Sequence, residues 1–254
     1  MFARERQNII CDLIKENGSV TTTELIAMFG VSIETIRRDL QELEKNNRLR
    51  RVHGGAIAVG EMNQFQELSV RLHKHDSQKK ELSRTAAEMV HDGDVIGVDA
   101  GSTAYYFAQA LKEIRRNVTV VTYSLDVFQI LNGVADFEVI LCGGHFLKKE
   151  NAFSGPLTLE MLRQLHVQKA FVFPTAVSMQ HGICDHEQEF VLMQKQLIAC
   201  ADTVYILADS SKFEKIELLR VAEMKKNYIY VTDRGLSPGL AAAYHKNQYQ
   251  LYVN

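Results

Sequence analysis

Long hydrophobic runs and prolines are both scarce in this 254-residue chain. No apolar run approaches the roughly 18 residues that a membrane-spanning helix needs, which argues against a transmembrane protein. The first residues enter an amphipathic pattern at once and lack the apolar segment of a secretory signal. With only three prolines and 46% apolar residues, the chain has the composition of a globular protein without a disordered tail.

Cysteine is also rare, and its four positions lie far apart in the sequence. All of them except Cys184 lie inside apolar runs. Buried, reduced thiols of a cytoplasmic protein fit this distribution better than a disulfide framework does. The four are Cys11, Cys142, Cys184 and Cys200.

An excess of one charge is missing as well, because 29 Lys and Arg nearly balance 31 Asp and Glu. Residues 1–57 nevertheless contain nine basic and eight acidic side chains, whereas the remainder contains 20 and 23. The basic excess is local, since residues 48–53 include three arginines and no acid. Such a cluster is usually a solvated surface, but this one directly follows a predicted helix that carries two more arginines.

Three helices are predicted before residue 46, and the first ends near residue 17. The second begins with a capping box, in which Thr21 caps the helix and Glu24 reaches back to it. Gly30 ends the second helix, because glycine tolerates a left-handed position freely. Ser32 then caps the third helix.

The third helix carries its apolar residues on one side, at spacings of 3, 4 and 3. The outer side then holds Thr35, Arg37 and Arg38. This arrangement is typical of a helix-turn-helix, whose second helix lies in the major groove of DNA. Arginine suits that place because its planar fork matches guanine or phosphate with two hydrogen bonds. The residues expected to face inward are Ile33, Ile36, Leu40 and Leu43.

A two-stranded wing is predicted after this helix. Leu49–Val52 and the pair Ala56 and Ile57 flank a turn that begins at His53 and contains two glycines. A three-helix packing module with a surface hairpin is the alternative, but the capped turn, paired arginines and basic hairpin together favour DNA binding. The arginines that the wing brings beside the DNA backbone or minor groove are Arg48, Arg50 and Arg51.

The segment ELIAMFGVSIETIRRDLQELEKNNRLRRVHGGA resembles the N-terminal signature of the DeoR family of bacterial sugar-operon regulators. In that family the T-[IV]-R-R-D-L-x-x-L-E run is the recognition helix, and the R-x-x-G-G-A segment is the wing. The residues that the resemblance implies as DNA contacts are Ser32, Thr35, Arg37 and Arg38 on the helix, with Arg51 and His53 on the wing.

The remaining sequence predicts a larger α/β domain. Apolar runs alternate with helical segments, which indicates strands buried on both faces of a mainly parallel sheet. We therefore expect a winged helix-turn-helix domain at 1–57, a linker at 58–78, and an α/β effector-binding and oligomerisation domain at 79–254. The predicted strands lie at 95–98, 118–121, 139–141, 170–173, 204–207, 228–231 and near 249–253.

Four of these strands are followed at once by small, polar or glycine residues. Open α/β sheets bind ligands at the carboxyl ends of their strands, so these loops are expected to share one crevice. Gly101, Ser102 and Thr103 open a helix whose free N–H groups and dipole make an anion site, and Lys212 would add a point charge. The candidate effector-binding residues are Asp99, Gly101, Ser102, Thr103, Thr122, Tyr123, Ser124, Gly143, Gly144 and Lys212.

The blocks DGDVIGVDAGSTAYYFAQAL, VVTYSLDV, VILCGGHF and ADTVYILADSSKFEK also resemble the effector domain of the DeoR family. That domain is similar in fold to ribose-5-phosphate isomerase and the coenzyme-A transferases. The resemblance implies a phosphorylated sugar or related metabolite as ligand, held by the Asp-x-Gly-Ser-Thr loop and the lysine of Asp-Ser-Ser-Lys. Arg71 and Lys79 or Lys80 resemble two further basic residues of the family. Tyr123 replaces the usual asparagine, and Pro174 replaces a glycine-rich strand end.

Two other functions are open. A sugar-phosphate isomerase or transferase would need a carboxylate base over the substrate carbon, and Asp99, Asp185, Glu187 and Glu189 form no evident pair. A metal-responsive regulator could use nearby donors, although their H-x-x-C-x-H spacing matches no standard site. These donors are His181, Cys184, His186, Glu187 and Glu189.

We expect a cytoplasmic transcription regulator, and specifically a repressor of carbohydrate-metabolism genes. It is expected to bind double-stranded operator DNA as a homodimer or homotetramer, because one winged helix covers too little DNA for a specific site. We expect no enzymatic activity, no cofactor and no membrane partner.

Overall fold

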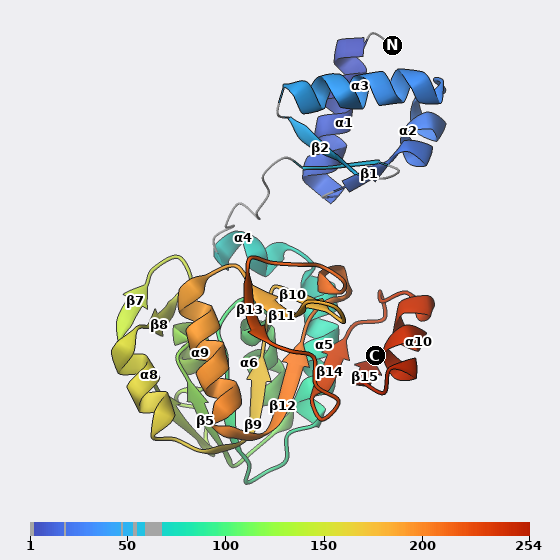
Figure 1. Cartoon of the computed structure of the whole chain (residues 1–254). Coiled ribbons are helices and arrows are strands. Elements are labelled where there is room, and N and C mark those ends of the chain that lie inside the picture. The colour runs from blue at the N-terminus through green and yellow to red at the C-terminus, as the bar shows by residue number, and fades with distance from the viewer. Residues whose placement is uncertain (1–2, 18, 47, 53–54, 59–67) are drawn as a thin grey trace. The chain divides into compact units, whose positions relative to one another are not determined.

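The structure, a computed structural model, describes residues 3–17, 19–46, 48–52, 55–58 and 68–254. The chain divides into two units, residues 1–64 and residues 65–254 (Figure 1). Of the residues expected to contact DNA, His53 and the side chain of Arg50 lie outside the described part.

The first unit packs three helices around an apolar core together with a small antiparallel sheet. The strand order is β1-β3-β2, so the predicted hairpin is present, and β1 adds a third strand that the sequence did not indicate. The elements are α1 (Ala3–Asn17), β1 (Ser19–Thr21), α2 (Thr22–Phe29), α3 (Ile33–Lys45), β2 (Leu49–Val52) and β3 (Gly55–Ala58).

The turns between the helices form as their sequences predict. Thr21 Oγ1 accepts a hydrogen bond from the N–H of Glu24 at 3.2 Å, and the Glu24 carboxylate accepts one from the N–H of Thr21 at 2.9 Å. Gly30 ends α2 with a left-handed φ of +62°, and the Ser32 hydroxyl caps α3. Local contacts therefore fix where α2 ends and α3 begins.

The buried side of α3 differs from the predicted one. Three of the four apolar residues expected to face inward are buried, but Ile33 is 37% exposed and Asp39 is only 3% exposed. At about 100° per residue, Ile33 lies about 70° from the mean direction of the buried residues. Asp39 is buried because Arg6 of α1 pairs with it, with Nε 2.5 Å from Oδ2.

Asp39→Ala is expected to destabilise the first unit. Removing one partner of a buried ion pair leaves the other charge uncompensated, which costs about 3–5 kcal/mol. Amide hydrogen exchange in α1 and α3 of the full chain should therefore become at least about a hundredfold faster. Gln41→Ala, at an exposed position of the same helix, is the control. Equal exchange in Asp39→Ala and in the wild type would show that the pair does not stabilise this unit.

The second unit places all seven predicted strands in one sheet. Their order is β15-β14-β12-β9-β4-β5-β6, and every neighbouring pair is parallel. The expected fold class, a winged helix-turn-helix followed by a mainly parallel α/β domain, is confirmed. The strands are β4 (Val95–Val98), β5 (Val118–Thr122), β6 (Phe137–Leu141), β9 (Val167–Val172), β12 (Ala201–Leu207), β14 (Ile229–Thr232) and β15 (Gln250–Val253).

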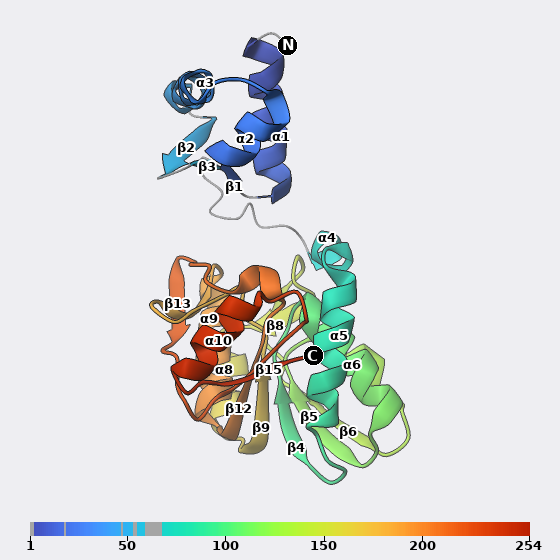
Figure 2. The ribbon, with the colours of Figure 1, turned by 90° about the vertical axis from the view of Figure 1, so that its right-hand side faces the viewer.

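Helices cover both faces of this sheet (Figure 2). On one face the rings of Phe107 and Phe171 stack with their centroids 4.5 Å apart. On the other face, a Cβ at Gly97 would stand 2.6 Å from Leu197 Cδ1, so a larger residue here would force the Leu197 side chain to move. The first layer is α5 (Asp76–Glu88), α6 (Ser102–Ile114) and α7 (Leu125–Leu131), and the second is α8 (Pro156–Arg163), α9 (Gln188–Ala199) and α10 (Pro238–Lys246).

Several short elements were not predicted, because three or four residues are too few for a period to be recognised. A hairpin of β7 and β8 follows β6, and a separate antiparallel sheet has the order β10-β11-β13. These elements are β7 (His145–Leu147), β8 (Ala152–Ser154), β10 (Ala176–Ser178), β11 (Gly182–Asp185), the 3-10 turn η1 (Ser210–Lys212) and β13 (Leu219–Ala222). A longer helix, α4 (Leu68–His73), precedes α5.

The stretch expected as a linker is partly helical. Residues 59–67 lie outside the described part, whereas α4 and the start of α5 belong to the second unit. The N–H of Leu68 donates to the carbonyl of Lys149 at 3.2 Å. The four cysteines are free and buried, as expected. Among the described helices, none has the length and apolar character needed to cross a membrane.

Candidate functional site

The outer side of α3 presents two exposed arginines, Arg37 and Arg38. At about 100° per residue, Arg38 lies about 30° from the direction opposite the core, and Arg37 about 70°. The N–H of Thr35 donates to Ser32 Oγ at 3.3 Å, and the two hydroxyl oxygens lie 3.0 Å apart. Ser32 therefore fixes the first turn, and Arg38 is the arginine that points more directly away from the core.

The wing is attached to α3 through Glu44. The N–H of Arg51 donates to Glu44 Oε1 at 2.9 Å, and Arg51 Nε lies 3.8 Å from Oε2. Arg48 Nη1 donates to Asn8 Oδ1 of α1 at 3.3 Å. Both arginines stay exposed. Neither Glu44 nor Asn8 was singled out in the sequence, because their partners lie outside the spacing of a single helix.

In the second unit, Asp99 connects the loops at the carboxyl ends of the strands. Its Oδ1 accepts hydrogen bonds from the hydroxyl of Tyr123 and the N–H of Ala100. Its Oδ2 accepts them from the N–H of Phe173 and from Gln194 Nε2, each at 2.9 Å. Burial raises the pKa of Asp99 to about 6 although these donors lower it. Both oxygens accept hydrogen bonds within the protein, so Asp99 joins these loops to one another.

Other predicted effector residues also make contacts within the scaffold. Thr122 Oγ1 donates to a main-chain carbonyl of β4 at 2.8 Å, and Ser124 caps α7. The carbonyl of Gly143 accepts a hydrogen bond from Thr158 Oγ1 at 3.1 Å. A Cβ at Gly144 would stand 2.1 Å from the same hydroxyl oxygen. These contacts within the protein are sufficient to explain why a hydroxyl group or a glycine stands at each of these positions.

The first turn of α6 is different, because no side chain caps it and one of its hydroxyl groups has no partner among the described residues. Gly101 precedes the helix with a φ of +112°, and no side chain caps the helix there. Ser102 and Thr103 are buried, and Thr103 Oγ1 has no hydrogen-bond partner among the described residues. The N–H groups of a first turn have no partner inside the helix and carry its positive dipole. This turn is suited to an anion.

Two basic residues of α4 and α5 lie near this turn. Arg71 Nη1 is 4.0 Å from the place that a Cβ of Gly101 would take. Lys79 is 3% exposed, and its Nζ donates to the carbonyls of Arg71 and Lys74. Burial, together with the nearby charge of Lys212, lowers the pKa of Lys79 to about 8.

Lys212 is the third cation of the crevice. Its Nζ donates to the carbonyl of Pro174 at 3.0 Å and lies 3.9 Å from Asp209 Oδ2. Burial lowers the pKa of Lys212, and Arg71 adds to the decrease while Asp209 opposes it. The main-chain carbonyl at position 174, where this chain departs from the family, therefore helps to position this lysine.

Two residues that the sequence did not single out complete the crevice. Glu150 forms an ion pair with Arg71, and Gln194 Nε2 donates to Asp185 Oδ2 at 3.1 Å as well as to Asp99. Gln194 is a polar residue on the apolar side of α9, and this position in the helical pattern could have identified it as a buried polar residue. Glu150 lies in a polar turn, and its sequence gives no such signal.

The donors considered for a metal ion make other contacts. Cys184 Sγ donates to the carbonyl of His181 at 3.7 Å, and His186 Nδ1 lies 3.2 Å from Asp185 Oδ1. Although burial raises it, the pKa of Asp185 is below its usual range because of His186. Within the described residues, no group of three or more His, Cys, Asp or Glu side chains is placed to hold a metal ion.

Comparison with known proteins relates both units to one family. Residues 6–61 match the DeoR-like helix-turn-helix domain, and residues 74–234 match the DeoR C terminal sensor domain. The chain belongs to the DeoR family. The resemblance stated from the sequence is thereby confirmed.

Relatives of this DeoR-family protein are transcriptional regulators. It is 34% identical to the HTH-type transcriptional regulator YulB of Bacillus subtilis, over 96% of this chain and 93% of the relative. It is 31% identical to the HTH-type transcriptional repressor GlcR of the same species, over 100% of this chain and 97% of the relative. The L-fucose operon activator of Haemophilus influenzae is 30% identical, over 92% and 94%.

Solved structures resemble part of the fold. For ribose 5 phosphate isomerase A from Neisseria gonorrhoeae, the TM-score is 0.42 and the identity 18%, over 57% of this chain and 55% of that one. For the ribose 5-phosphate isomerase of Methanocaldococcus jannaschii, the TM-score is 0.41 and the identity 19%, over 55% of each chain. The aligned part thus spans about half the length of either enzyme.

Arg38→Ala is expected to weaken binding to an operator selected from random duplexes by about 1–3 kcal/mol and to relax the preference at one base pair. Arg51→Ala should instead weaken binding to all sequences alike and flatten its salt dependence. Salt titrations on the operator and on a scrambled duplex separate these effects, with Arg163→Ala in the second unit as control. Wild-type affinity and base preference in Arg38→Ala would contradict the assignment of this side chain to base reading.

Proposed function

We propose that this protein is a sequence-specific repressor of carbohydrate-metabolism genes whose affinity for operator DNA is controlled by a phosphorylated sugar or related metabolite. Relatives named as the repressor GlcR, the L-fucose operon activator and the lactose phosphotransferase system repressor of Lactococcus lactis support the carbohydrate link. The protein would act in the cytoplasm on double-stranded DNA. A homodimer or homotetramer would place one recognition helix on each of two half-sites.

The observation that carries the ligand part of this proposal is the first turn of α6, which no side chain caps and which lies near three cations. Phosphate groups bind at helix N-termini because free N–H groups and the dipole meet the negative charge. Lys79 and Lys212 both have lowered pKa values, since they are buried near other cations. A bound phosphate would stabilise their charged forms, whereas an uncharged sugar would not.

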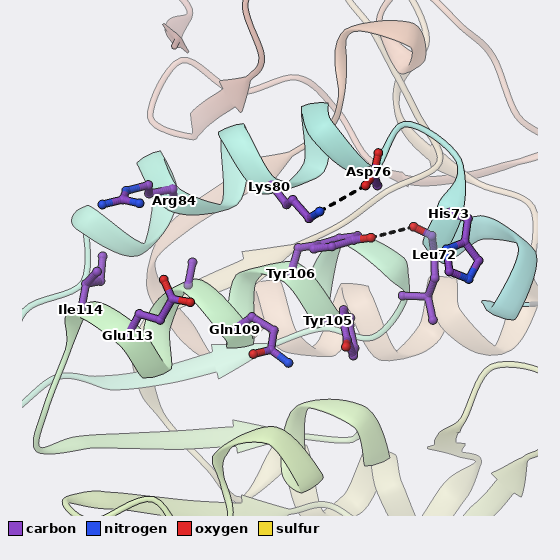
Figure 3. Close-up of a pocket in the computed structure, with 11 residues that line it drawn as sticks. Leu72, His73, Asp76, Lys80, Arg84, Tyr105, Tyr106, Gln109, Glu113 and Ile114 are labelled. Carbon is purple, nitrogen blue, oxygen red and sulfur yellow. Dashed lines mark hydrogen bonds and ion pairs between the residues drawn. The ribbon is translucent and has the colours of Figure 1, made fainter.

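Control would begin at α4, the first helix of the second unit. The last carbonyls of a helix lack partners within it. Here those of Arg71 and Lys74 accept from Lys79, and that of Leu72 accepts from the Tyr106 hydroxyl at 2.9 Å (Figure 3). Lys79 and Tyr106 belong to α5 and α6, the helices that also supply the proposed anion site. A ligand that changes the position or charge of these groups would change how firmly α4 is held.

The same contacts argue against an isomerase. Proton abstraction from a sugar phosphate needs a carboxylate that can approach the substrate carbon. Asp99 already accepts four hydrogen bonds, and Gln194 holds Asp185 beside it. Neither of these two carboxylates is free to act as the base, and the relatives named above are regulators, so we propose that the site binds its ligand without converting it.

Lys212→Ala is expected to leave operator binding intact and to abolish the effect of the ligand. The lysine lies in the second unit, and its loss removes a charge from the proposed anion site. Operator binding titrated with a panel of sugar phosphates would measure this, with Lys215→Ala at an exposed position of the same loop as control. An allosteric coupling of about 1–3 kcal/mol would change the affinity about 5- to 150-fold. An equal response in Lys212→Ala and the wild type would contradict the proposed site.

Tyr106→Phe is expected to reduce the effect of the ligand on DNA binding while leaving the affinity for the ligand alone nearly unchanged. The variant removes one hydrogen bond to α4, worth about 0.5–1.5 kcal/mol, so the response should fall by about 2- to 10-fold. Tyr105→Phe removes a hydroxyl from the adjacent residue in the same groove (Figure 3) and serves as the control. If both variants respond like the wild type, α4 does not transmit the signal through this contact.

A further inference from the structure

We propose that the crevice has a second part, in which Glu150 and Gln194 accept hydrogen bonds from hydroxyl groups of the ligand's carbon chain. This part is called the hydroxyl pocket below. The inference rests on the proposed function, because it assumes a phosphorylated ligand at the first turn of α6. It adds that the ligand must carry free hydroxyl groups, and it assigns two residues that read them.

The hydroxyl pocket adjoins the proposed phosphate site through two connected series of contacts. On one side Arg71 lies 4.0 Å from the Cβ position of Gly101 and pairs with Glu150. On the other side Gln194 contacts Asp99, which lies two residues before Gly101 in the sequence. Both series start at the same turn, so one small molecule could reach both.

Glu150 and Gln194 each keep one unused acceptor inside the protein. Both side chains belong to residues that are only 2% exposed. Among the described residues, neither Glu150 Oε1 nor Gln194 Oε1 has a hydrogen-bond partner. The other polar atoms of the two groups are engaged, since Glu150 Oε2 pairs with Arg71 and Gln194 Nε2 donates to Asp99 and Asp185. Buried acceptors without a partner are unusual in folded proteins and indicate a missing donor.

Because both unused atoms are hydrogen-bond acceptors, they restrict which groups of a ligand can bind next to them. Both are acceptors, so phosphate or carboxylate oxygens of a ligand would be repelled, whereas hydroxyl groups can donate to them. A cationic amine is disfavoured because Arg71 already balances the charge of Glu150. Two hydroxyl groups of a sugar or polyol chain would satisfy both acceptors. The hydroxyl pocket therefore fits a polyhydroxylated phosphate ester and not a bare phosphate or a phosphorylated acid.

Calorimetric titration of the full-length wild type tests this without any variant. The probes are inorganic phosphate, ribose 5-phosphate, glucose 6-phosphate and fructose 6-phosphate, followed by each single-deoxy analogue of the tightest binder. We expect at least one sugar phosphate to bind at least about tenfold more tightly than inorganic phosphate, and at least one deoxy analogue to lose about tenfold or more, because a site built to pair with a hydroxyl rejects the analogue that lacks it.

Glu150→Gln replaces one carboxylate oxygen by an amide NH2 group in a side chain of nearly the same shape. If the amide oxygen faces Arg71, the NH2 group takes the place of the acceptor Oε1. The variant should weaken the tightest sugar phosphate by at least about tenfold, whereas the affinity for inorganic phosphate should not fall, because the variant removes a negative charge beside Arg71. Glu138→Gln, at an exposed position of β6, is the matched control. Lys212→Ala should weaken all phosphates together.

The outcomes separate the two proposals. If phosphates bind and Lys212→Ala abolishes binding, but every deoxy analogue binds as tightly as its parent, the hydroxyl pocket is refuted and the proposed function stands. The hydroxyl pocket is also refuted if no sugar phosphate binds more tightly than inorganic phosphate. If no phosphate compound binds at all, the proposed function falls, and the hydroxyl pocket with it.

Discussion

Asp99 has no exposed surface, and hydrogen bonds from four other residues converge on its two carboxylate oxygens. A buried carboxylate is costly unless such donors surround it. Its partners come from the loops after β5 and β9 and from α9, so satisfying this one group fixes three neighbouring elements around the end of β4. Gly101 then turns the chain into α6 with its first turn uncapped. The turn proposed as the anion site therefore follows the strand end around which this buried charge orders its neighbours.

Two cations of this site have acidic neighbours, but burial and the other cations still disfavour the charged forms of its two lysines. Arg71 pairs with Glu150, and Lys212 lies near Asp209, yet the pKa values of Lys79 and Lys212 are both lowered because burial and neighbouring cations disfavour their charged forms. In a crevice of low dielectric constant such repulsion is screened less than in water. An added anion would remove part of this cost, which an uncharged compound could not do. The arrangement of these cations thus favours the binding of a negatively charged group.

Much of this architecture could be read from the sequence, and the failures have physical causes. The seven strands were predicted because each is a continuous apolar run, and the capping box at Thr21 and the left-handed Gly30 depend only on local contacts. Asp99 does follow a strand end, as its sequence indicates, but its contacts depend on donors as distant as Gln194, 95 positions along the chain. Glu150 was missed for the same reason. A pattern in sequence records local periodicity, and it cannot record which long-range partner occupies an acceptor.

Lys79 combines two tasks that would otherwise need separate groups. Its ammonium is held by the carbonyls of Arg71 and Lys74 at the end of α4, and it also contributes to the positive potential of the crevice. Any anion that stabilises the charged form of Lys79 therefore also strengthens the donor that holds α4. Because coupling between two sites is reciprocal, a change in α4 that follows DNA binding must alter the affinity for the anion by the same factor. One buried lysine thus contacts the end of α4 and also carries one of the charges on which the proposed ligand site depends.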